Sequence, residues 1–248
     1  MPISNRPRDR APLLAFAGGV LVTVGVACLL ADLALERQRQ EFLAAARQAK
    51  AAVLTKVETS VALLRGTAGL FASVDTPVTV AAFHNYVGRL ALRERYPGIL
   101  GIGFAQRIHA GDEEVIARRM REQGQQDFHV WPEESPDLRT TITLLEPLDV
   151  RNRAAIGYDM ATNPVRREAM DRARDSGHVE ASAIVQLVQE IDRNRQPGFL
   201  LYLPVYLEGD MPGTVARRRE LLLGFAYSPI RTVDFLSSAC CASARARR

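Results

Sequence analysis

The side chains that could carry chemistry are scattered along this sequence. Its histidines are His84, His109, His129 and His178, and neither they nor the cysteines show the spacing of a zinc site. The sequence has no GxSxG or P-loop motif, and Gly101-Ile-Gly103 has only two of the glycines of a dinucleotide fingerprint. We therefore predict no enzyme, cofactor or metal. The two glycines are interpreted as strand residues beside a close neighbour.

One carboxylate differs from these scattered groups. Asp159 ends an apolar segment and lies just before Asn163-Pro164, which is a strong helix-start signal. An acid at this place is expected near a sheet and near backbone donors. It is either a turn or cap residue or a ligand contact. As a ligand contact it must be paired or hydrogen-bonded, because an unpaired buried carboxylate is costly.

The composition is that of a globular protein. Of 248 residues, 47% are hydrophobic and 24% are charged, and the net charge is +4. Nearly all of the positive charge is arginine, and no basic patch is interleaved with aromatic residues, so we predict no nucleic-acid partner. Residues 29–239 contain no cysteine, so the folded body has no disulfide.

An uncharged segment at residues 11–31 is long enough to cross a membrane, which requires about 20 apolar residues. Three arginines precede it, and positive charge keeps that side in the cytoplasm. We therefore predict a cytoplasmic N-terminus at residues 1–10 and a transmembrane helix at 11–31. The alternative is a cleaved signal peptide, but its apolar region is usually no longer than about 15 residues.

Residues 32–76 are predicted to form a stalk helix, because good helix formers dominate and no proline occurs between Pro12 and Pro77. Apolar residues recur at steps of three or four and form one stripe: Phe42, Ala46, Ala49, Val53, Val57, Val61, Leu64, Ala68 and Phe71. This stripe packs on the chain's own domain or forms the seam of a homodimer. Both interpretations can hold over different lengths of the helix.

Residues 77–236 show short strands and helices without regular βαβ alternation, which favours an α+β domain with an antiparallel sheet. Strands are predicted near 99–104, 140–145, 179–187, 199–207 and 221–227. A helix is predicted from Pro164 to Ser176, with Asn163 as its N-cap and Gly177 as its C-cap. Residues 237–248 are interpreted as an aberrant tail and not as part of the core.

An ordered series of motifs between residues 77 and 236 resembles the CHASE domain family. The motifs in this series are residues 96–105, Glu146-Pro147, Asn152-Arg153, Gly157–Met160, Pro164–Met170, Arg172–Gly177, Leu187–Glu190 and Gly198–Tyr206. The resemblance implies an extracytoplasmic sensor with a long stalk helix and PAS-like antiparallel sheets in tandem modules. Outputs in this family are usually histidine kinases, diguanylate cyclases or phosphodiesterases.

The resemblance also implies ligand-binding residues. In the plant members an aspartate in a similar Asp-Met strand contacts the adenine ring of cytokinins, and Asp159 occupies the matching position. A later strand that lines the same pocket corresponds here to Ala181 and Ser182. The residues that flank these positions differ from the plant pattern, so a cytokinin ligand is not implied.

Together these features predict a single-pass protein of the inner membrane whose C-terminal domain senses a small ligand outside the cytoplasm. Because the sequence ends at Arg248, we expect a receptor without its cytoplasmic output domain. The alternative is a stand-alone periplasmic ligand-binding or partner module without signalling output.

Overall fold

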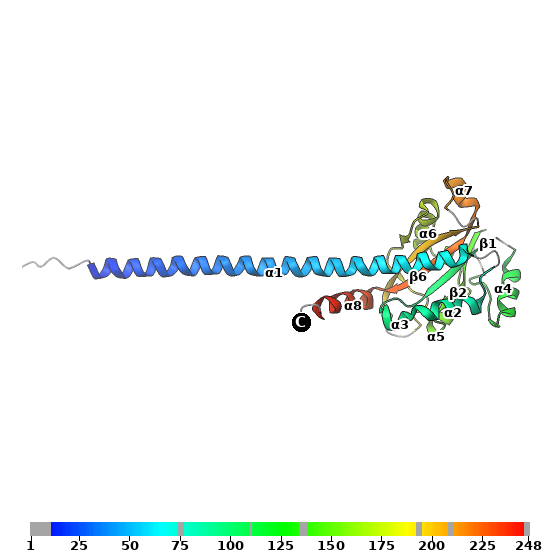
Figure 1. Ribbon diagram of the computed structural model, residues 1–248, viewed down its shortest axis with the longest axis horizontal. Coiled ribbons are helices and arrows are strands. Elements are labelled where there is room, and N and C mark those ends of the chain that lie inside the picture. Colours follow the sequence, from blue (N-terminus) through cyan, green and yellow to red (C-terminus); the bar gives the residue numbers. More distant parts are fainter. Residues whose placement is uncertain are drawn as a thin grey trace, which may run out of the picture. The chain divides into compact units, whose positions relative to one another are not determined.

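The chain forms two compact units, residues 1–51 and residues 52–248. The computed structural model describes residues 11–73, 77–109, 111–133, 138–191, 195–207 and 211–245. The first unit contains the beginning of helix α1 (Ala11–Ala72), and the second contains its end and all later elements (Figure 1). The predicted cytoplasmic segment, residues 1–10, lies outside the described residues.

Helix α1 contains the apolar run seen in the sequence. Pro12 lies in its first turn, where a missing backbone N–H breaks no helical hydrogen bond. Among the described residues, one helical segment, Leu14–Ala72, is long and apolar enough to cross a membrane by length and composition. Large apolar side chains such as Leu14, Phe16 and Leu21 are exposed on it. The predicted transmembrane residues therefore form part of a continuous helix with an apolar surface.

The second unit is built on one antiparallel sheet. Its strands are β1 (Ile102–His109), β2 (Leu138–Glu146), β3 (Glu180–Ala181), β4 (Val185–Gln186), β5 (Pro197–Tyr206) and β6 (Leu222–Arg231). The strand order is β2-β1-β6-β5-β3, and β4 also pairs with β5. The predicted α+β class with an antiparallel sheet is confirmed. The described part of the chain forms one sheet, where the family resemblance implied two modules.

Short helices connect the strands and cover the sheet. They are α2 (Val80–Leu90), α3 (Leu92–Arg95), α4 (Glu113–Glu122), α5 (Val150–Arg153), the 3-10 helix η1 (Met160–Thr162), α6 (Pro164–Ser176), α7 (Val215–Glu220) and α8 (Thr232–Arg245). Helix α6 has the predicted bounds. The Asn163 side chain accepts the backbone N–H groups of Val165 and Arg166, and Gly177 ends the helix with a φ of 75°.

The expected strand at residues 179–187 is interrupted, and the cause is a side chain. Ser182 Oγ accepts the backbone N–H of Leu200 at 3.0 Å and donates to the Ala183 carbonyl at 2.7 Å. The Ser182 hydroxyl thereby takes the Leu200 backbone N–H, which in a regular β-ladder would donate to a backbone carbonyl of the neighbouring strand. The chain leaves the sheet there and returns as β4.

The C-terminal region also differs from expectation. Strand β6 continues to Arg231, and α8 extends to Arg245 into the residues that we interpreted as a tail. Phe235 and Ala239 of this helix are buried, and Ser238 hydrogen-bonds to Lys56 of α1. Ser237, Ser238 and Ala239 are small and permit this close packing, so part of the supposed tail belongs to the folded domain.

Two hydrophobic cores lie on opposite faces of the sheet, because side chains alternate along each strand. The first core includes Leu64, Phe83, Val87, Ile102, Phe104, Ile116, Met120, Leu201 and Ala226. The second core includes Ala105, Met160, Ala169, Met170, Leu187, Leu200, Tyr202, Phe225 and Tyr227. The end of α1, α2 and α4 contribute residues to the first core, and Figure 1 shows these three helices in the sheet domain.

The apolar stripe of α1 divides along its length. Val53, Val57, Leu64, Ala68 and Phe71 pack in or against the first core. Phe42, by contrast, is 72% exposed. The later part of the stripe therefore packs on the chain's own domain, and its earlier part remains available for another partner.

Candidate ligand-binding site

Asp159 is fully buried at the border of the second core. Its Oδ1 accepts the backbone N–H of Thr140 at 2.9 Å and that of Ala161 at 3.0 Å, so it caps η1. Its own backbone N–H donates to the Trp131 carbonyl at 2.7 Å. The carboxylate thus joins η1 to strand β2, which is the cap role that the sequence left open. Contact with a ligand stays a prediction.

Ser182 and Ala181 lie at the far edge of the sheet. Ser182 is buried, and its hydroxyl bonds to Leu200, a residue of the second core. Ala181 is exposed, and its carbonyl accepts a hydrogen bond from Arg172 Nη2 at 2.8 Å. Asp159 and Ser182 therefore both adjoin the second core, while Ala181 lies at its outer edge.

Three polar residues that the sequence analysis did not select lie inside the second core. Arg166 of α6 is 2% exposed, and Tyr202 of β5 and Tyr227 of β6 are 0% exposed. Arg166 Nε and both phenol oxygens have no hydrogen-bond partner among the described residues. Buried polar atoms are usually paired, so the gathering of these three atoms in one core makes it a candidate site.

These groups face one another. Tyr202 and Tyr227 are directly paired in the β5–β6 register, and their ring centroids are 6.4 Å apart. The Arg166 guanidinium lies 5.1 Å from the ring centroid of Tyr158, and its Nη2 donates to the Gln186 carbonyl at 3.1 Å. We call Arg166, Tyr158, Tyr202 and Tyr227 the Arg166 cluster.

The electrostatics of the cluster favour hydrogen-bond donation. Burial raises the pKa of Tyr202 far above its usual value, and the nearby Arg166 charge opposes this only in part. Burial likewise raises the pKa of Tyr227. Both phenols therefore keep their protons at physiological pH. The cluster presents a positive charge with two neutral O–H groups beside it.

Local sequence explains how these side chains reach the core. A Cβ on Gly103 would lie 2.5 Å from Tyr227 Cε1, so only glycine lets the ring lie on strand β1. This is the close neighbour that we predicted for the glycine pair. Arg166, Ala169, Met170 and Ala173 share the buried face of α6. An arginine on a stripe of otherwise apolar residues was therefore the signal that could have revealed the site.

Other buried charges in the domain are paired, in contrast to Arg166. Glu190 receives hydrogen bonds from Arg231 Nε at 2.6 Å and Arg231 Nη2 at 3.0 Å. Glu146 lies 3.0 Å from His84 Nδ1. Within the described ranges, no group of three or more His, Cys, Asp or Glu residues could hold a metal ion. These groups stabilise the fold and do not form a second cluster of orphaned donors.

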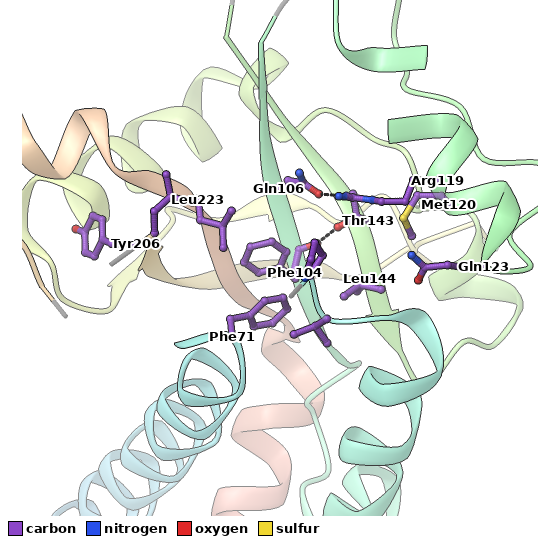
Figure 2. A pocket seen from close by; sticks show the side chains of 13 residues that line it. Phe71, Phe104, Gln106, Arg119, Met120, Gln123, Thr143, Leu144, Tyr206 and Leu223 are labelled. Carbon is purple, nitrogen blue, oxygen red and sulfur yellow. Dashed lines mark hydrogen bonds between the residues drawn. The ribbon is translucent and has the colours of Figure 1, made fainter. Parts of the chain in front are cut away.

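A separate cavity of about 210 Å³ lies on the first-core side, between the end of α1, α4 and the sheet (Figure 2). Phe71 and Phe104 stack there with centroids 4.0 Å apart. The polar side chains that line it have partners: Arg119 Nη2 donates to Gln106 at 2.6 Å, and Gln123 accepts the Val80 N–H at 2.8 Å. This cavity offers space, but its polar groups are already satisfied.

The described residues form an α+β domain built on one antiparallel sheet. The family model for the CHASE domain matches residues 76–246, so the chain belongs to the CHASE domain family. CHASE domains are extracytoplasmic sensory domains, and the class of the protein is therefore that of small-ligand sensors.

No curated protein matches this chain. Among solved structures, it is similar to the ligand-binding domain of the Pseudomonas aeruginosa PAO1 amino acid chemoreceptor PctC in complex with GABA. The TM-score is 0.47 and the sequence identity is 13%, and the match covers 79% of this chain and 63% of that chain. This chain thus spans less than two thirds of the length of that structure.

Proposed function

We propose that this protein is a membrane-anchored extracytoplasmic sensor that binds a small ligand in the second core, between the sheet and α6. The observation that carries the proposal is the Arg166 cluster, in which one guanidinium nitrogen, Arg166 Nε, and the hydroxyls of Tyr202 and Tyr227 are buried without a hydrogen-bond partner among the described residues. The protein acts by binding the ligand and not by converting it. Membership of a sensory family supports this function.

The sheet offers a route from the ligand to the stalk helix. Tyr202 and Tyr227 point into the second core, and the next residues along the same strands, Leu201 and Ala226, belong to the first core. That core also contains Leu64 of α1. A ligand that repositions β5 and β6 therefore alters the packing of α1, provided that it binds the two arrangements with different affinity.

Asp159, Ala181 and Ser182 form the border of the site in this proposal. Asp159 fixes η1 against β2, and Ser182 fixes the β3–β4 segment against β5. Both contacts hold chain segments that adjoin the second core. Direct ligand contact by any of the three is the part of the proposal that mutation must test.

The membrane and a second copy of the chain are the proposed partners besides the ligand. Residues 11–31 would span the inner membrane once, with the sheet domain outside the cytoplasm. The exposed early part of the stripe, which contains Phe42, would form the seam of a homodimer. Such a seam would carry a shift of the stalk helix to the membrane.

Ligand screening on the full chain in detergent micelles tests the binding function. We expect at least one compound from a library of amino acids, organic acids, amines and purines to raise the thermal unfolding midpoint. Asp159→Ala should weaken this effect, whereas Asp127→Ala, at an exposed position, should not. If every stabilising compound acts equally on both variants, Asp159 is not part of the site.

Reporter fusions test the topology. Alkaline phosphatase fused after Arg248 should be active, because that enzyme folds only outside the cytoplasm, and a matched fusion of a cytoplasmic reporter should be inactive. The opposite pattern would place the sheet domain in the cytosol and refute the proposed localisation.

A further inference from the structure

Arg166 is a buried charge whose neighbours do not neutralise it. Among the described residues, the guanidinium forms no ion pair; it donates to the Gln186 carbonyl and lies over the Tyr158 ring. A carbonyl and an aromatic face are weaker partners for a cation than a carboxylate is. Removing a charge from water without an anion is costly, so this position is explained by a negative partner that arrives from outside the chain.

The two tyrosines restrict the chemistry of that partner. Both phenols are protonated, and their oxygens have no partner among the described residues. Arg166 Nε offers a further donor from α6. A carboxylate has two oxygens with about four acceptor positions, so it can accept from a guanidinium and from two phenols together. A cation would be repelled by Arg166, and a purely apolar ligand would leave the donors unpaired.

The apolar residues around the Arg166 cluster indicate that the ligand has a small aliphatic part. Met160, Met170, Leu187 and Phe225 belong to the same core, and α6 presents Ala169 and Ala173 to it. The methionine side chains are flexible and can adapt their shape to a guest. The site therefore combines a polar end with an apolar wall.

We propose that the sensed ligand is a small organic carboxylate, whose anionic group binds Arg166 while Tyr202 and Tyr227 donate to its oxygens. This inference rests on the proposed sensor function and narrows it to one ligand class. The carboxylate would supply the negative charge that Arg166 lacks and the acceptors that both phenols lack.

The chain contains a built-in reporter for this site. Its single tryptophan, Trp131, lies 4.7 Å from Tyr158 between ring centroids, and Tyr158 in turn faces Arg166. Trp131 Nε1 donates to the Ile156 carbonyl at 2.9 Å, which fixes the indole. A ligand that displaces the Tyr158 ring should therefore change the tryptophan fluorescence.

The test titrates the full chain in detergent micelles with matched compounds. The probes are acetate, propionate, butyrate, hexanoate, succinate and γ-aminobutyrate, each compared with the corresponding amide, and butylamine serves as the cationic control. We expect at least one carboxylate to raise the thermal midpoint and to change Trp131 fluorescence. Its amide should bind at least about 10-fold more weakly, because the charge-assisted hydrogen bond is lost.

Two sets of variants place the binding at the cluster. Arg166→Gln should weaken carboxylate binding at least about 10-fold, whereas Arg118→Gln, which removes the same charge from an exposed position, should leave it unchanged. If Arg166→Gln fails to fold, Tyr202→Phe and Tyr227→Phe answer the same question. Each removes only an unpartnered hydroxyl, so the fold should persist while carboxylate binding weakens.

The outcomes separate this inference from the sensor function. Equal binding of acid and amide, or carboxylate binding that survives in Arg166→Gln, would overturn the carboxylate assignment. An amine or neutral ligand that depends on Tyr202 and Tyr227 would do the same and leave the sensor function intact. If no compound in the library or the acid series binds, and ordered water fills the cluster in a crystal structure, both proposals fail.

Discussion

The two faces of the sheet use the same strands for different purposes. On the first face, α1, α2 and α4 enclose a largely apolar core, and the buried hydroxyls that α1 contributes, Ser60 and Thr67, donate to carbonyls one turn earlier. On the second face, α6 and the alternate residues of β5 and β6 bring together Arg166, Tyr202 and Tyr227, whose Nε and two hydroxyls have no hydrogen-bond partner in the described chain.

This difference indicates that the first core serves stability and the second core serves ligand binding. A largely apolar core contributes stability and couples the stalk helix to the domain. Orphaned donors reduce stability, and natural sequences retain such groups mainly where function requires them. The first core should therefore be sensitive to loss of volume, and the second should tolerate loss of its orphaned polar groups while losing ligand binding.

The largest expected effect is a cavity in the first core. Leu64 is completely buried where α1 packs on the domain, so Leu64→Ala should lower the free energy of unfolding by about 3 kcal/mol. Denaturant titration followed by Trp131 fluorescence measures this change. Leu54→Ala is the control, because Leu54 on the same helix is 51% exposed and should change stability by less than about 0.5 kcal/mol. Equal effects would show that α1 is not an integral part of the first core.

The second expected effect concerns Asp159 at the border of the second core. Asp159→Ala leaves two backbone N–H groups without their acceptor and should cost about 2 kcal/mol of unfolding free energy. Asp159→Asn retains one side-chain oxygen and should cost less. Denaturant midpoints of both variants measure the difference.

The Asp159 variants also separate its two possible roles. A purely structural cap predicts that stability falls, while ligand affinity falls only to the extent that the site is distorted. A variant with wild-type stability and no ligand response would instead establish Asp159 as the direct ligand contact that the resemblance implies.

Much of the fold followed from local signals in the sequence. Helix α6 was predicted to the residue, because Asn163, Pro164 and Gly177 each impose a backbone conformation without help from distant contacts. The antiparallel sheet followed from the pattern of short strands. The break between β3 and β4 did not, because it depends on a hydrogen bond between Ser182 and Leu200, which are distant in sequence.

The site was only partly predictable for the same reason. Asp159 was noticed because it stands alone in an apolar segment. The Arg166 cluster depends on the register that pairs Tyr202 with Tyr227 and on the space that Gly103 leaves for a ring, and neither is visible in one sequence. The sequence analysis therefore did not select Arg166, although it lies on the buried face of α6 with Ala169, Met170 and Ala173.

A smaller effect compares two tyrosines of the second core. The Tyr206 hydroxyl donates to the Arg174 carbonyl at 2.7 Å, whereas the Tyr227 hydroxyl has no partner among the described residues. Tyr206→Phe should therefore cost about 1 kcal/mol of unfolding free energy, and Tyr227→Phe should cost nothing or stabilise the ligand-free protein. Thermal and denaturant unfolding without ligand measure both. A loss of 1 kcal/mol or more in Tyr227→Phe would indicate that its hydroxyl is bonded, for example to ordered water.

The smallest effect concerns the rim of the second core, where α6 meets α7. Hydrogen bonds from Arg219, and then from Arg174, hold the pKa of Asp175 well below its usual range. Since the pKa of this carboxyl is lower in the folded state, its contribution to stability is fully present above the unfolded value of about 3.9 and is lost as pH falls below it. The thermal midpoint of the wild type should thus fall more steeply below about pH 4 than that of Asp175→Asn.

Asp171→Asn is the matched control for this acid-side effect. Asp171 also pairs with Arg174, at 2.7 Å, but it is more exposed than Asp175 and has no bond to Arg219 among the described residues. Its variant should keep the acid-side slope of the wild type. The Asp175 effect should also shrink in 1 M salt, because the Arg219 side chain is 58% exposed and its charge is screened. Identical profiles for both variants would show that the α6–α7 contact does not stabilise the rim.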